Sequence, residues 1–238
     1  MKFYYIRHSL DKNILGENPQ VKDFIYNCDV SNNPLFIDKF HFERIDVNPI
    51  VVNPVLHHES NLTDLIDANG DIGFTYTKLI SNKLKSILES KKASGVQFFQ
   101  CSVFKDGIEY KDYWLLSVYE FNMNFIDFSS SEITVGIKKS GGGTERKNVK
   151  VQTLEEFLKV QENHKQKMEI VSINKVHLVD DIKDDLFFIK TAGKYVVSDK
   201  LKSEIENVGC TGIEFQPVEF SINEWLQGGE REKVYGKI

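Results

Sequence analysis

Two segments of this 238-residue chain repeat one pattern, 117 positions apart and without a gap. Residues 81–98 align with residues 198–215, with eight identical positions and five more of similar character. Each segment begins with a serine that can cap a helix and continues with apolar residues spaced by three and four positions. A glycine and alternating apolar residues follow, as in a turn that leads into a strand. The chain is therefore expected to form a helix, a glycine turn and a strand twice.

A strand is also expected before each copy, at residues 74–76 and 194–197. A strand-helix-strand unit that occurs twice indicates a possible internal duplication. The alternative is that two unrelated passages converged on the same capping and spacing, because short matches between common helix residues also arise by chance.

The remaining elements are mixed in order and type. Thr153 and Glu156 have the spacing of a capping box and predict a helix that continues to His164. Runs rich in β-branched and aromatic residues predict further strands at 3–6, 50–56, 113–119, 133–137, 169–173 and 186–189. Since strands and helices do not alternate regularly, we expect an α+β fold with mixed, largely antiparallel sheets and a few packed helices.

One stretch has the composition of a linker. Residues 138–150 are basic and contain three consecutive glycines. We therefore expect an N-terminal α+β lobe at 1–137 and a C-terminal α+β lobe at 151–238, joined by this basic glycine-rich loop.

Composition excludes several classes of protein. With 41% hydrophobic residues and a net charge of −5, the chain is neither disordered nor a general nucleic-acid binder. Its three cysteines form no metal or disulfide pattern, and no cofactor or metal is expected. No apolar run approaches the roughly 18 residues of a membrane span, so we expect a cytoplasmic protein without a membrane partner.

The N-terminal Arg7 and His8 follow a short predicted strand and resemble the Arg-His-Gly signature of histidine phosphatases. That chemistry also needs a second histidine in the phosphate pocket, together with further arginines. His177 is the one candidate on a late strand, and it lacks a neighbouring glycine. A structural role at a strand end is favoured, and an enzyme that uses Arg7 and His8 stays the alternative.

A run of acidic residues lies just before the predicted strand at 186–189. It comprises Asp180, Asp181, Asp184 and Asp185. Most such runs are solvated turns. Like charges held together also select a basic partner, so these four residues are the candidate partner-binding site.

The C-terminal part of the chain resembles a bacterial immunity-protein family of polymorphic toxin systems, the eleventh immunity family, formerly a domain of unknown function. The resemblance covers about residues 110–220 and depends on the segments 170–173, 185–188, 197–201 and 211–218. It implies a protein that binds and neutralises a cognate toxin without a reaction of its own, and it supplies no catalytic residue or cofactor. A non-catalytic adaptor module is a further alternative.

Overall fold

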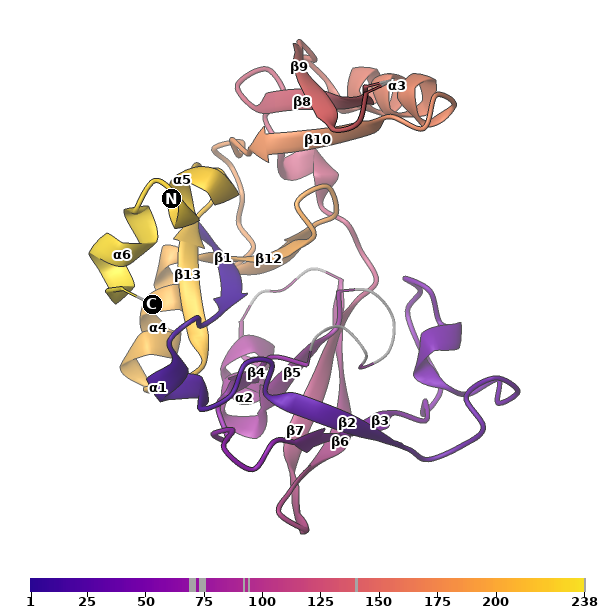
Figure 1. The fold of residues 1–238 in the computed structure, drawn as a ribbon, viewed down its shortest axis with the longest axis vertical. Coiled ribbons are helices and arrows are strands. Elements are labelled where there is room, and N and C mark those ends of the chain that lie inside the picture. Colours follow the sequence, from indigo (N-terminus) through magenta and orange to yellow (C-terminus); the bar gives the residue numbers. More distant parts are fainter. Residues whose placement is uncertain (69–71, 73–75, 92, 94, 140, 238) are drawn as a thin grey trace.

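The structure, a computed structural model, describes residues 1–68, 72, 76–91, 93, 95–139 and 141–237. These residues form three β-sheets with short helices packed against them (Figure 1). Nearly all neighbouring strands run antiparallel, which confirms the predicted α+β class with mixed, largely antiparallel sheets. No helix in the described ranges is long and apolar enough to cross a membrane.

The largest sheet has six strands in the order β2-β3-β6-β7-β5-β4. Strands β3 and β6 run parallel, and the other neighbours are antiparallel. Helix α1 (Lys12–Leu15) precedes this sheet, and the 3-10 helix η1 (Ile37–Lys39) lies between its first two strands. The strands are β2 (Val21–Tyr26), β3 (Val52–Leu56), β4 (Leu65–Ile66), β5 (Lys78–Ser81), β6 (Val96–Lys105) and β7 (Ile108–Val118).

A four-stranded sheet in the order β11-β12-β1-β13 brings the two ends of the chain together. Strand β1 (Phe3–His8) pairs antiparallel with both β12 and β13. The other strands are β11 (Leu186–Ile189), β12 (Lys194–Ser198) and β13 (Ile213–Pro217). Residues from both predicted lobes therefore share one sheet. The division into lobes at 1–137 and 151–238 stays a prediction.

The third sheet has three strands in the order β10-β8-β9. They are β8 (Glu132–Lys138), β9 (Thr144–Val149) and β10 (Ile170–Lys175), preceded by the 3-10 helix η2 (Met123–Phe125). The segment that sequence analysis assigned to a connecting loop thus contains β9. Gly142 and Gly143 take positive φ in the turn, and Lys138 pairs with Thr144 to close the hairpin.

Helix α3 (Leu154–Lys165) packs against β10. As predicted, the Thr153 side chain caps it by accepting the Glu156 backbone N–H. In a capping box Glu156 would accept the backbone N–H of Thr153. Here the Glu156 carboxylate accepts the N–H of Gln152, one residue before the cap, instead.

The predicted repeat forms two units with the same strand order and register. One unit is β4-β5-β7-β6 with α2 (Asn82–Glu89), and the other is β11-β12-β1-β13 with α4 (Asp199–Asn207). Ser81, the last residue of β5, lies opposite Tyr113 of β7, as Ser198 of β12 lies opposite Phe3 of β1. The pairing of β6 with β7 corresponds in the same register to that of β13 with β1. Strand β1 therefore occupies in the second unit the place of β7 in the first.

The helix caps repeat with the units. Asp64 Oδ1 accepts a hydrogen bond from Ser81 Oγ at 2.6 Å, and Asp185 Oδ1 accepts one from Ser198 Oγ at 2.6 Å. Each serine oxygen also accepts a backbone N–H in the first turn of its helix, at 3.1 and 3.2 Å. The predicted serine caps are thus confirmed. The strand expected at 74–76 includes Phe74 and Thr75, which lie outside the described residues, and β5 leads into α2.

One hydrophobic core joins the two units. Helices α2 and α4 pack together, and the core contains equivalent positions of both, such as Leu84 and Leu201 or Leu88 and Ile205. The spacing of three and four residues brings these side chains to one face of each helix. The shared core fixes the four-stranded sheet against the six-stranded sheet.

Two short C-terminal helices, α5 (Ile222–Leu226) and α6 (Glu230–Tyr235), lie beside the four-stranded sheet (Figure 1). Tyr235 Oη accepts the backbone N–H of Phe215 at 2.7 Å, which ties α6 to β13. Strand β13 in turn pairs with β1, so this contact holds α6 against the four-stranded sheet.

Candidate functional site

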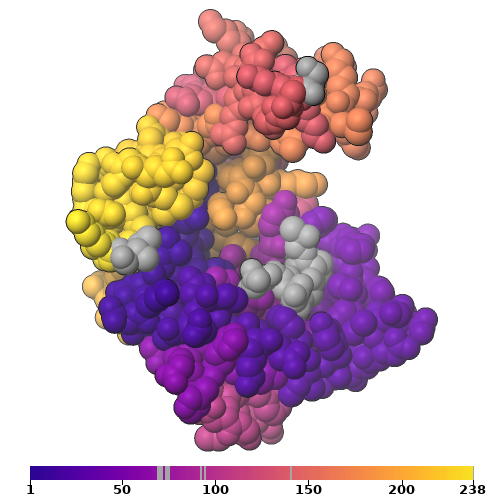
Figure 2. Space-filling view, in the orientation of Figure 1, coloured from indigo at the N-terminus to yellow at the C-terminus, as the bar shows by residue number. Residues whose placement is uncertain are grey.

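A polar cleft of about 520 Å³ lies between the four-stranded and the three-stranded sheets. Strands β1, β12 and β13 supply its floor, and the three-stranded sheet supplies the opposite wall. In the space-filling view the molecule is indented where the part that carries the three-stranded sheet and α3 meets the rest (Figure 2). The polar lining of the cleft includes Arg7, Lys194 and Gln216 on the floor and Arg146, Ser172 and Asn174 on the wall.

Two half-buried cations lie on the floor of this cleft. Strand alternation puts Arg7 on the same face of β1 as Tyr5, and its Nη1 donates to Gln216 Oε1 at 2.8 Å. Lys194 begins the neighbouring strand β12. Burial lowers the pKa of Arg7, and burial together with the charge of Arg7 lowers the pKa of Lys194. Among the described residues, no carboxylate lies within ion-pair distance of either cation.

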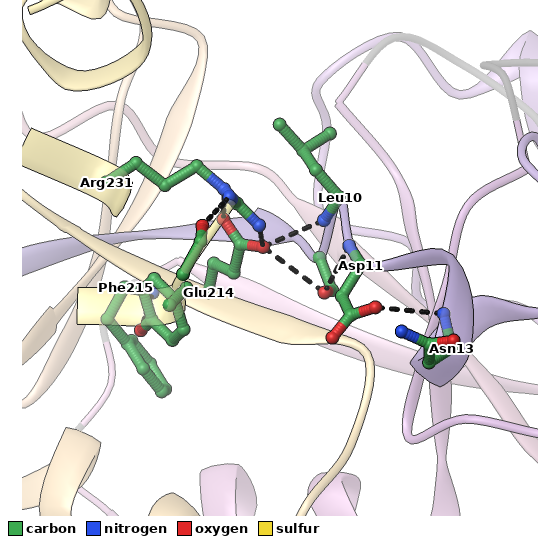
Figure 3. Close-up of polar contacts among 9 residues, drawn as sticks. Leu10, Asp11, Asn13, Glu214, Phe215 and Arg231 are labelled. Carbon is green, nitrogen blue, oxygen red and sulfur yellow. Dashed lines mark hydrogen bonds and ion pairs between the residues drawn. The ribbon is translucent and has the colours of Figure 1, made fainter. Parts of the chain in front are cut away.

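The carboxylate opposite Arg7 in the strand register is bound by another arginine. Glu214 of β13 receives hydrogen bonds from Arg231 Nε at 2.7 Å and from Nη2 at 2.5 Å (Figure 3). It also accepts the backbone N–H of Leu10 at 2.8 Å. Both side chains of this ion pair are 2% exposed. Glu214 is therefore engaged by Arg231. Its charge raises the pKa of Arg7, but by less than burial lowers it, and the hydrogen-bond partner of Arg7 is the neutral amide of Gln216.

The wall adds a third cation and neutral hydrogen-bonding groups. Arg146 of β9 is exposed, and Ser172 and Asn174 project from β10. Glu132 is the acidic residue in this wall, and its carboxylate lies 3.6 Å from the ammonium of Lys175. Positive charge therefore prevails in the cleft, an arrangement that attracts anions.

Arg7 and His8 lie on opposite faces of β1, because consecutive strand residues point in opposite directions. Arg7 lines the cleft, whereas His8 lines a separate pocket of about 190 Å³. His177 is exposed in the connection after β10, and no second histidine lines either space in the described ranges. The groups that the histidine-phosphatase alternative requires are not brought together there.

His8 is expected to make stability depend on pH. Burial lowers the pKa of His8 well below 6.5, and the nearby charges of Lys78, Lys194 and Arg7 lower it further. The pKa is lowered even though the carboxylate of Asp67 lies 3.5 Å from Nδ1 of His8. Below pH 6.5 the unfolded chain therefore binds a proton that folded His8 does not, and the free energy of unfolding falls as pH falls. Against a His8→Gln variant in urea titrations from pH 5 to 8, the wild type should lose relative stability below pH 6.5.

His58 provides the contrasting control. It is exposed, and its hydrogen bond to Asp106 raises its pKa. A His58→Gln variant should therefore show the opposite trend, with the wild type gaining relative stability as pH falls. A pH-independent difference between wild type and His8→Gln would contradict the assignment.

The acidic run divides into two kinds of residue. Asp180 and Asp181 are exposed in the connection between β10 and β11. Asp184 is buried, and Asp185 is half-buried and bound to Ser198. A partner-binding role for the four stays a prediction, and the exposed pair is the part that solvent and a partner can reach most freely.

An exposed groove of about 640 Å³, lined by apolar and by charged side chains, runs between α3 and β10. Leu158 is 52%, Ile170 69% and Met168 78% exposed. Exposed apolar patches often mark surfaces that bind other molecules. The surface thus carries two hollows, this groove and the cationic cleft.

A comparison with known protein families shows which family the chain belongs to. A family model described as "Immunity protein family (Imm11)" matches residues 37–220. The match covers more than half of the chain, and the chain therefore belongs to this immunity protein family. The matched range begins well before the segment 110–220 that carried the resemblance in the sequence. No curated protein matches the chain.

Proposed function

We propose that this chain is an immunity protein that binds and neutralises a cognate bacterial toxin of a polymorphic toxin system, without catalysis of its own. Membership of the immunity protein family over residues 37–220 supports the proposal. In this proposal the two proteins meet in the cytoplasm. The alternative is an adaptor that binds its partner without inhibiting it.

We place part of the toxin contact at Asp180 and Asp181. Both are exposed in a loop, and adjacent negative charges attract a basic surface and raise its rate of association. Asp184 and Asp185 are left out of this contact, since Asp184 is buried and Asp185 holds the cap of α4.

The test uses the toxin encoded in the neighbouring reading frame. Replacing both Asp180 and Asp181 by serine should weaken toxin binding about tenfold, mainly through slower association, because an attractive rim charge acts on the encounter. Surface plasmon resonance at several salt concentrations measures this effect, which should shrink as salt rises.

A matched control replaces Glu43 and Asp46, two exposed acids on another loop, by serine. This change removes the same charge and should leave toxin binding unaltered. Equal affinity of the Asp180 and Asp181 variant and the wild type would refute this contact while leaving toxin binding intact. Failure of the wild type to bind the toxin would overturn the proposed function, and binding that leaves the toxin active would favour the adaptor.

A further inference from the structure

We propose that the cleft between the four-stranded and three-stranded sheets binds a phosphate-bearing small molecule through Arg7, Lys194 and Arg146. This site is distinct from the acidic toxin contact and does not depend on it. The argument starts from the three cations, which come from three different strands and line one space.

The charges on the floor are unusual for a purely structural role. Burying a cation is unfavourable unless a counter-charge or a full set of hydrogen bonds compensates it. Arg7 has the amide oxygen of Gln216, and the neighbouring carboxylate of Glu214 is held by Arg231. Lys194 has no ion-pair partner in the described part of the chain. An anion entering the cleft would supply the missing charge.

The arrangement favours a ligand with more than one negative charge. Arg7 and Lys194 lie on adjacent strands of the floor, whereas Arg146 lines the cleft from the opposite wall. A phosphate carries up to two negative charges and accepts hydrogen bonds from several directions, and an arginine fork matches its oxygens. The net charge of the chain is −5, so this cationic cluster is local and not part of a general basic surface.

The size and lining of the cleft extend the argument beyond a bare ion. About 520 Å³ lies within the range of pockets that hold small organic molecules. Ser172 and Asn174 offer a hydroxyl and an amide above the cations, and the ring of Phe220 also lines the space. These groups suit the organic part of a phosphate ester.

Isothermal titration calorimetry of the full chain at low salt tests the site, with pyrophosphate, ADP and citrate as probes. Pyrophosphate and ADP are expected to bind, and tighter binding of ADP would show that the organic part makes contacts of its own. A Lys194→Met variant, which keeps most of the side-chain length and removes the charge, should raise the dissociation constant of both about tenfold or more. The exposed Lys200, changed to Met, provides the matched control and should leave binding unchanged.

Urea unfolding without ligand separates a binding role from a structural one. If Lys194 serves a ligand, Lys194→Met should be at least as stable as the wild type, because repulsion from Arg7 is removed. Binding of citrate alone would overturn the phosphate assignment. No binding of pyrophosphate or ADP to the wild type, equal binding by the Lys194 and Lys200 variants, or a marked loss of stability in Lys194→Met would overturn the site.

Discussion

Replacing Arg231 by methionine should lower the free energy of unfolding by about 3–5 kcal/mol, because it leaves a buried carboxylate without its cation. Glu214 and Arg231 are each 2% exposed, and the guanidinium binds both carboxylate oxygens. The same guanidinium donates to the backbone oxygen of Gly236 at 3.0 Å, so it also holds the end of α6. Urea denaturation at pH 7 measures the loss.

Adding Glu214→Gln to Arg231→Met should restore part of this loss. The amide removes the unpaired charge and can still accept the N–H of Leu10. Arg44→Met is the control for an exposed arginine, since Arg44 is 68% exposed, and it should change stability by less than about 0.5 kcal/mol. If Arg231→Met costs no more than Arg44→Met, the Glu214 pair is not closed off from water.

The elements with strong local signals could be predicted from the sequence. Ser81, Thr153 and Ser198 each accept a backbone N–H at the start of the helix that they were expected to cap. Capping and apolar spacing act within a few residues, so a sequence displays them directly. The two units of the repeat follow from these signals.

The register of the repeat depends on contacts that no local pattern contains. Strand β1 takes the position of β7 in the second unit, although it lies at the opposite end of the chain from β12 and β13. Its aromatic and β-branched residues predict a strand but not a partner. Strand β9 was missed because its sequence is polar and its residues are largely exposed, so it lacks the apolar alternation of a half-buried strand.

The site residues were only partly visible for the same reason. Arg7 was singled out in a motif with His8, yet strand alternation separates the two side chains and joins Arg7 to Lys194 and Gln216 instead. Asp185 looked equivalent to Asp180 within the acidic run. Its contact with Ser198 depends on the pairing of β11 and β12, which the composition of the run does not reveal.

Gly212→Ala should lower the free energy of unfolding by about 3 kcal/mol, since both the backbone conformation and the surrounding space require glycine. Gly212 has a φ of +80°, and a Cβ there would lie 2.4 Å from the backbone oxygen of Leu65 and 2.7 Å from the Cβ of Thr63. The neighbouring Thr211 carbonyl accepts the N–H of Leu65 at 3.2 Å, so the two units meet at this point.

Gly209 in the same loop is the matched control, because its φ is +72° and an added Cβ would meet nothing within 4 Å. Gly209→Ala should therefore cost only the backbone strain, about 1 kcal/mol. Urea denaturation of both variants measures the difference, and equal losses would mean that the approach of the two units at Gly212 contributes nothing to stability.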